Sequence, residues 1–383
     1  MSGLRPVPDA VFSDRQCAAA RAVVEDLGGP EQVHLAFLGG SLAVGLGHAT
    51  SDVDLYVVAD RPPGSSAVLT RDGVEVHVLT LDAAMVTRLI DVGSAYAVTG
   101  ADRGQLNLDP RTRHGLVRVL TGWRLRCTDG WERELGRLRR DVVRQIFMAH
   151  HAAQFAGYAE DVLGALDARD PYTALASSSL ALTAAAEAAL AASDDIYLGD
   201  KFLFRRLTRT PVTAPWAGPL WALLHEPVAA GDPLPRLRGL TDRRLRAGNL
   251  LLAWCALEGW SAPLTALPAP LTALPAPPAA APAWRSPYAT PLRFRDGLAL
   301  IGPGESYRVD DAVLRRWRDA RPGDAGDDLR ALAALGLLGD GAPEPAPPGT
   351  TPPPGARPEP SFAWQPRTDR LPDPVPAGPK AGR

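Results

Sequence analysis

The stretch FLGGSLAVGLGHATSDVDLYVVAD, residues 37–60, decides the fold of this chain. An apolar run ends at Gly39–Ser41, where a short helical turn is expected to begin. A second apolar run, Val53–Val58, is short and β-branched, with Asp52 and Asp54 at its start. Side chains two residues apart on a strand point to the same face. The stretch therefore predicts two carboxylates on one face of a strand, next to a glycine turn.

The two halves of this stretch suit complementary parts of a phosphate-bearing ligand. Backbone N–H groups and the Ser41 hydroxyl at a helix start would form a phosphate cradle, and Gly40 would let the backbone approach the anion closely. Two carboxylates as close as Asp52 and Asp54 repel each other unless a divalent cation lies between them. A phosphate cradle beside a Mg²⁺-binding carboxylate pair indicates phosphoryl or nucleotidyl transfer.

A third carboxylate lies on the following strand, Val74–Leu79, in which valines alternate with Glu75 and His77. If this strand pairs beside Val53–Val58, Glu75 reaches the same site. One metal would then bridge a triphosphate, and a second would lower the pKa of an acceptor hydroxyl. His77 shares the face of Glu75 and either lines the acceptor site or is a partly buried structural histidine; His48 is interpreted as incidental.

These residues resemble the signature of the DNA polymerase β-type nucleotidyltransferase superfamily, in which Gly-Ser is followed, about ten residues later, by Asp-apolar-Asp at a strand start. Here the signature is Gly40–Ser41 and Asp52–Val53–Asp54, and the third acid of the family matches Glu75. The resemblance covers about residues 15–125. It implies that Asp52, Asp54 and Glu75 hold two Mg²⁺ ions for catalysis, and that Gly40 and Ser41 bind the phosphates of an NTP.

Outward from the signature, the pattern indicates a small α/β (α+β) sheet domain. Residues 13–28 read as a capped helix, and Val33–Leu38 as a strand leading into the glycine turn. The order helix, strand, helix, strand, strand ends near residue 125. From Trp131 to Trp260 the chain is predicted to be helical. The expected helices are residues 131–168 as one long helix, 170–192, 200–209, 216–224 and 243–258.

The helical half carries residues that the resemblance singles out. Family members that modify small molecules, such as the aminoglycoside nucleotidyltransferases, place a helical-domain lysine on the triphosphate and a helical-domain Glu as general base. By this resemblance Lys201 is expected to bind phosphate, with Arg205 and Arg206 as alternatives. Glu187 is a candidate base, or else an exposed helix carboxylate. His150–His151 are interpreted as ordinary helix residues, since neighbours on a helix point about 100° apart.

The composition changes at Ser261. APLTALP at residues 262–268 is repeated at 269–275, which is typical of an extended linker. A hairpin over residues 292–309 and helices opening at Asp310 and Asp327 follow. They loosely resemble the winged-helix domains that capture leader peptides in peptide-modifying systems, so a role in docking a peptide, a protein or a nucleic acid is a hypothesis for this module. Its arginines at positions 315, 316 and 318 form either a docking surface or a solvated helix face.

The predicted organisation thus has five segments. They are a nucleotidyltransferase sheet domain, an all-helical domain, a Pro/Ala-rich linker, a small winged-helix-like module and a disordered Pro-rich tail, at residues 1–125, 126–260, 261–286, 287–340 and 341–383.

Bulk composition narrows the function classes. The net charge of −2 argues against nucleic acid as a partner, because binding to phosphodiester backbones needs a dense basic surface. Three widely spaced cysteines fit neither a disulfide framework nor a Cys-type zinc site, and they fit a reducing compartment. No secretory signal and no membrane span are expected, so the expected location is cytoplasmic.

The leading hypothesis is an enzyme that moves a nucleoside monophosphate from an NTP, with ATP as the first candidate, to a hydroxyl of a small molecule or protein, releasing pyrophosphate. The alternative is a non-catalytic nucleotide-binding sensor or scaffold that docks a peptide or protein partner through its C-terminal module. An RNA-tailing polymerase is disfavoured by the near-neutral charge. The antitoxin-like minimal nucleotidyltransferases are much shorter and usually lack a helical domain.

Overall fold

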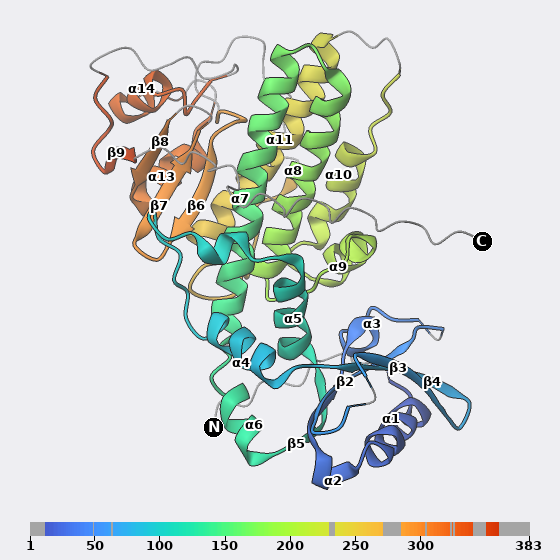
Figure 1. Cartoon of the computed structure of the whole chain (residues 1–383). Helices are drawn as coiled ribbons and strands as arrows, with labels where there is room; N and C mark the ends of the chain where they lie inside the picture. Colours follow the sequence, from blue (N-terminus) through green and yellow to red (C-terminus); the bar gives the residue numbers. More distant parts are fainter. Residues whose placement is uncertain are drawn as a thin grey trace, which may run out of the picture.

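The computed structural model describes residues 12–48, 50–62, 64–229, 234–270, 285–302, 305–321, 324, 326–339 and 350–359 (Figure 1). A mixed sheet near the N-terminus lies below a bundle of long helices in this view. A second, antiparallel sheet lies against the side of the bundle. The mixed α/β architecture with a large helical part is as predicted.

The first sheet has the strand order β3-β4-β2-β1-β5. Its strands are β1 (Val33–Leu38), β2 (Val53–Ala59), β3 (Ser66–Arg71), β4 (Val74–Thr80) and β5 (Trp123–Cys127). β2 and β4 are parallel, and the other neighbours are antiparallel. The predicted pairing of β4 beside β2 is confirmed, and its register sets Asp54 opposite His77. Directly paired residues share a face, so these two side chains lie on the same side of the sheet.

Each face of this sheet has its own apolar cluster. Alternate residues of β2 and β4 pack with α1 (Asp14–Asp26), which begins at a capping box formed by Ser13 and Gln16. On the other face, Tyr56 of β2 belongs to a buried cluster with residues of α4 (Ala83–Val92) and α6 (Asp129–Leu135). The short elements α2 (Gly29–Gln32), α3 (Gly40–Ala43) and η1 (Gly104–Asn107) and the helix α5 (Pro110–Thr121) complete this part.

The helical bundle consists of α7 (Arg140–Asp167), α8 (Pro171–Ala192), η2 (Asp200–Phe202), α9 (Leu203–Arg209), α10 (Ala214–Leu224) and α11 (Leu234–Leu257). The single long helix predicted over residues 131–168 is wrong: it is two helices, α6 and α7. Gly136 ends α6, and Arg139 is extended, with its N–H bonded to Gly93 O at 3.0 Å. α6 packs on the first sheet and α7 in the bundle, so the sheet domain extends past residue 125.

α8 is long and apolar enough to cross a membrane, but 72% of its most apolar window is buried inside the molecule. Its alanines let α7 and α11 approach closely, and the three helices share one apolar cluster. That cluster also takes in residues of α4, α5 and η1, so the sheet domain and the bundle have a continuous core.

The second sheet has the order β6-β7-β8-β9, all antiparallel. Its strands are β6 (Thr290–Phe294), β7 (Gly297–Ile301), β8 (Ser306–Val309) and β9 (Ala356–Glu359), and α13 (Asp311–Asp319) and α14 (Asp327–Ala334) lie between β8 and β9 in the chain. The prediction of a disordered tail is wrong for β9. An outer strand needs only backbone bonds to one neighbour, and it tolerates proline there. The winged-helix-like arrangement is not confirmed.

This C-terminal part is joined firmly to the bundle. Ala253, Ala256 and Leu257 of α11 form one buried cluster with residues of β7, β8 and α13. Arg315 and Arg318 of α13 both contact Glu258, just beyond α11. These arginines therefore hold the module in place. The predicted linker falls largely on residues 271–284, which lie outside the described residues, as do residues 341–349 and 360–383 of the predicted tail.

Candidate functional site

The glycine turn after β1 lies directly against the start of β2. Gly39 N donates to Asp54 O at 2.9 Å. Gly40 has a φ of +72°, and a Cβ atom there would lie 2.1 Å from Asp54 Oδ2. A Cβ atom at Gly39 would lie 2.6 Å from the Tyr56 ring. Both glycines are therefore needed for the side chains of Asp54 and Tyr56 to pack against the turn.

Replacing Gly40 by alanine should be costly. The substitution forces a side chain into the left-handed region and into the space of the Asp54 carboxylate, so we expect a loss of about 2–4 kcal/mol in the free energy of unfolding. Gly164 on α7 is the matched control, because a Cβ atom there meets nothing within 4 Å. Gly164→Ala should instead stabilise by about 0.5–1 kcal/mol. Urea unfolding of both variants measures the difference, and equal stabilities would contradict the packing described.

A cavity of about 450 Å³ lies between the first sheet and the bundle. The sheet contributes the turn and the paired acids, and the other walls come from α5 and from the segment around η2. The lining includes Gly40, Ser41, Asp52, Asp54, Tyr56, His114, Arg118, Tyr197 and Lys201. Five of the six residues predicted for the site thus line one cavity. Lys201 reaches this cavity from the helical half, and its Nζ lies 4.8 Å from the Phe202 ring centroid.

Glu75 occupies a different position from the other predicted residues. It is exposed on β4, and it lines a neighbouring cavity of about 700 Å³. Asp52 lines both cavities, so Glu75 shares a wall with Asp52 but not with Asp54. Within the described residues, no group of three or more His, Cys, Asp or Glu side chains is placed to hold a metal ion. The predicted three-acid cluster therefore stays a prediction.

The electrostatics of Asp54 suit a cation. Burial raises the pKa of Asp54; the nearby His77 lowers it, Asp52 raises it, and Arg118 lowers it, with a net rise. The positive charges near Asp54 thus do not fully offset the cost of burying its ionised carboxylate. Mg²⁺ is commonly bound by one or two carboxylates together with phosphate oxygens. Asp52 and Asp54 fit a Mg²⁺ ion of that kind.

α5 supplies residues that the sequence did not single out. The Arg118 guanidinium lies 5.1 Å from the Tyr56 ring centroid, on the cavity wall. Burial raises the pKa of Tyr56 to about 12 against the opposing charge of Arg118. Burial and the charges of Arg118 and Arg113 lower the pKa of His114, which is therefore neutral at pH 7. No motif marks α5, because its place beside the acids depends on packing between segments far apart in the chain.

Three residues that were candidates for the site, Glu187, Arg206 and Arg205, are held by other partners. Glu187 is neither exposed nor in the cavity: it is buried and accepts two hydrogen bonds from Arg206 Nη1, at 2.9 and 2.7 Å. Arg206 is 1% exposed and also contacts Asp195, so it does not present its guanidinium to a phosphate. Arg205 donates to the carbonyl of Leu46 at 2.8 Å.

The histidine pair of α7 belongs to the core, as interpreted from the sequence. His150 Nδ1 lies 2.7 Å from Leu106 O, and its other ring nitrogen contacts Arg113. Burial lowers the pKa of His150 to about 4 and lowers that of His151 as well. Both are neutral, buried side chains with fixed polar partners.

Comparisons with known proteins do not assign a function to this chain. No family model matches this chain, and no curated protein matches it at a significant level. Among solved structures, the crystal structure of a nucleotidyltransferase-like protein from Exiguobacterium sibiricum 255-15 is similar over 63% of this chain and 79% of that chain, with 14% sequence identity and a TM-score of 0.34. At that TM-score the likeness carries no argument about function.

Proposed function

We propose that this chain is a Mg²⁺-dependent nucleotidyltransferase, which moves a nucleoside monophosphate from an NTP to a hydroxyl of a small molecule or a protein and releases pyrophosphate. One observation carries the proposal: a single cavity brings together the Gly40–Ser41 turn, the Asp52 and Asp54 carboxylates, and Lys201 from the helical half. A phosphate cradle, a metal-binding pair and a cation are what transfer at the α-phosphate needs.

Each group has a role in this proposal. Asp52 and Asp54 would hold a Mg²⁺ ion, which would supply positive charge against the negative charge that develops during transfer. The backbone at Gly40 and the hydroxyl of Ser41 bind phosphate, and Lys201 and Arg118 neutralise the departing pyrophosphate. Glu75, beside Asp52, would add a ligand for a second ion or receive the acceptor proton.

The test begins with binding. ATP, GTP, CTP and UTP are titrated calorimetrically into the protein with and without Mg²⁺. Mg²⁺-dependent binding of at least one NTP is expected, and it justifies an acceptor screen that follows pyrophosphate release. If none of the four binds in the presence of Mg²⁺, the proposal fails.

A second candidate is a non-catalytic nucleotide-binding sensor or scaffold. The separation of Glu75 from Asp54 favours it, because the described residues contain no three-acid group for a metal. Pyrophosphate release separates the two candidates. A sensor binds the NTP and releases none with any acceptor, whereas the enzyme releases one pyrophosphate for each nucleotide transferred.

Replacing Lys201 by glutamine should weaken NTP binding about ten- to a hundredfold, because a charge-assisted hydrogen bond contributes about 1.5–3 kcal/mol. Arg118→Gln should act in the same direction. The matched control is Arg88→Gln on the exposed surface of α4, which should leave the Kd unchanged. Calorimetric titration measures the Kd of all three variants. A Kd for Lys201→Gln equal to that of the control would show that Lys201 does not bind the NTP.

A further inference from the structure

The loop that follows Ser41 is folded back on the glycine turn. Leu46 N and Gly47 N both donate to Ser41 O, at 2.8 and 3.0 Å. Val44 and Leu46 are buried in a small apolar cluster with Phe202, the neighbour of Lys201. The position of the turn is thereby coupled to the position of this loop.

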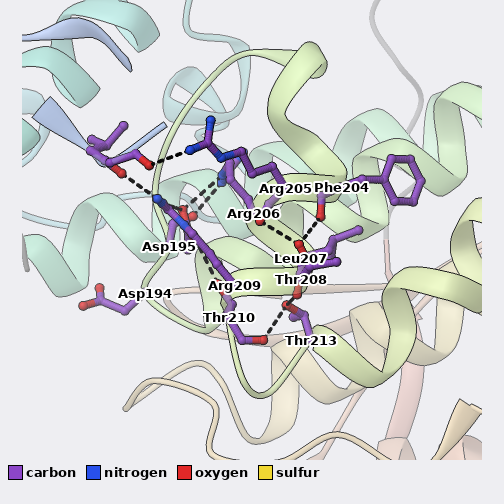
Figure 2. Close-up of polar contacts among 12 residues, drawn as sticks. Asp194, Asp195, Phe204, Arg205, Arg206, Leu207, Thr208, Arg209, Thr210 and Thr213 are labelled. Carbon is purple, nitrogen blue, oxygen red and sulfur yellow. Dashed lines mark hydrogen bonds and ion pairs between the residues drawn. The ribbon is translucent and has the colours of Figure 1, made fainter. Parts of the chain in front are cut away.

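Two arginines of α9 hold the loop from the bundle side. Arg209 Nη1 donates to Val44 O at 2.5 Å, and Arg205 Nη1 donates to Leu46 O at 2.8 Å. Residues four apart lie on the same face of a helix, so both side chains reach the loop together. Figure 2 shows both arginine side chains, and dashed lines mark the hydrogen bonds that they donate to the loop.

Arg209 differs from Arg205 because a carboxylate fixes it. Its Nε and Nη2 donate to the two oxygens of Asp195 at 2.9 and 3.0 Å, a bidentate pair that orients the guanidinium plane (Figure 2). The Asp195 side chain is 9% exposed and also accepts from Arg206 Nε at 3.0 Å. Burial would raise the pKa of Asp195, but the hydrogen bond from Arg209 and the charges of both arginines outweigh it and lower that pKa.

We infer that Arg209 is a positioning residue for the proposed NTP site: it joins Asp195 of the bundle to the carbonyl of Val44, and so fixes the Gly40–Ser41 turn relative to Lys201. The inference rests on the proposed function for its nucleotide readout. A displacement of about 1 Å in such a geometry can lower the reaction rate about a hundredfold. Loss of the Arg209 link should therefore slow transfer and, by moving the phosphate-binding turn, weaken NTP binding, although Arg209 does not line the cavity itself.

The experiment compares Arg209→Ala, Arg209→Lys, Arg205→Ala and Thr208→Ala in the full chain. Thr208 is the control, because it is exposed and its hydroxyl donates to carbonyls of its own helix. The readouts are the Kd of each Mg²⁺·NTP complex, the KM and kcat of transfer, and the unfolding midpoint in urea. Arg209→Ala should raise Kd and KM about ten- to a hundredfold. Arg205→Ala should have a smaller effect, and Thr208→Ala none.

Arg209→Lys separates positioning from stability. Lysine keeps a positive charge beside Asp195 and should restore the unfolding midpoint. A single ammonium group lacks the planar fork that grips Asp195 while reaching Val44 O, so the Kd should stay raised. A Kd for Arg209→Ala within twofold of that for Thr208→Ala overturns the inference. If Arg209→Ala does not fold, the same criterion applies to Arg209→Lys.

A second measurement keeps this inference distinct from the proposed function. If the wild-type protein binds no NTP, amide hydrogen exchange still reports on the loop. The amides of Leu46 and Gly47 should exchange about tenfold faster in Arg209→Lys than in the wild type, while those of α8 keep their rates. Unchanged exchange at both loop amides would show that Arg209 does not position the turn.

Discussion

Replacing Asp54 by asparagine is expected to reduce the proposed nucleotidyl transfer at least about 10³-fold, because Asp54 would hold the Mg²⁺ ion, and a metal ion that offsets transition-state charge contributes several kcal/mol. Asp54 is the half-buried acid of the cavity, and the glycine turn is shaped around it. The matched control is Asp60→Asn at the other end of β2, where the carboxylate is exposed and pairs with His34. The activity of both variants is measured as pyrophosphate release, with the NTP and the acceptor that the titration and the screen identify. Activity within tenfold of the wild type in Asp54→Asn would contradict the assigned role.

The same variant should not lose stability. The folded protein raises the pKa of Asp54 above its unfolded value, so the folded state binds more protons between the two values. The free energy of unfolding then falls as pH rises from about 3.9 through the folded pKa, and asparagine removes this fall. Without added metal, Asp54→Asn should match the wild type near pH 4 and exceed it at pH 7. Urea unfolding in EDTA at both pH values measures this, and a lower stability at pH 7 would contradict the electrostatics described.

Replacing Glu187 by alanine should have the largest effect on stability, a loss of about 3–5 kcal/mol. The variant leaves the guanidinium of Arg206 deep in the bundle with one carboxylate partner instead of two. Urea unfolding at pH 7 measures the loss. The matched control is Glu132→Ala, since its ion pair with Arg124 is much more exposed and should contribute less than about 1 kcal/mol.

A double variant separates the cost of an unpaired charge from the value of the pair. Glu187→Leu/Arg206→Met should recover most of the lost stability, because apolar groups of similar volume replace a buried ion pair at little cost. Asp195 keeps Arg209 as a partner in that variant. A loss below about 1 kcal/mol in Glu187→Ala would show that the buried pair is not a main support of the bundle.

The local part of the fold could be predicted from the sequence. Val53–Val58 and Val74–Leu79 have strand periodicity, and the glycines before Ser41 mark a turn, so the acids could be placed without the structure. β3 could not be predicted in this way. Ala67 and Leu69 pack on the first sheet's apolar cluster, but the exposed Val68 lies between them, so the apolar residues of β3 do not alternate with polar ones. The α6–α7 break was hidden because the residues between them continue the helical pattern, while the two helices pack on different parts of the molecule.

The candidate site likewise has residues that the sequence predicts and residues that it does not. Gly40, Ser41, Asp52 and Asp54 lie close in sequence, so spacing alone predicts their meeting. Arg118 enters from α5 through contacts that join distant segments, and no local pattern reports these. Glu75 lies beside Asp52 because Val53 of β2 pairs with Val76 of β4. The alternation of valines predicts a strand there, but it does not predict which residues of the two strands pair.

Strand β9 covers a sheet edge that would otherwise be open to other molecules. β9 covers the outer edge of β8, and its residues pair with β8 from Ser306 to Val309. A protein shortened before residue 350 would leave that row of backbone N–H and C=O groups open. Such an open edge recruits strands from other molecules and starts aggregation. A segment that looks dispensable by composition is therefore expected to keep the protein monodisperse, and its removal during preparation should be avoided.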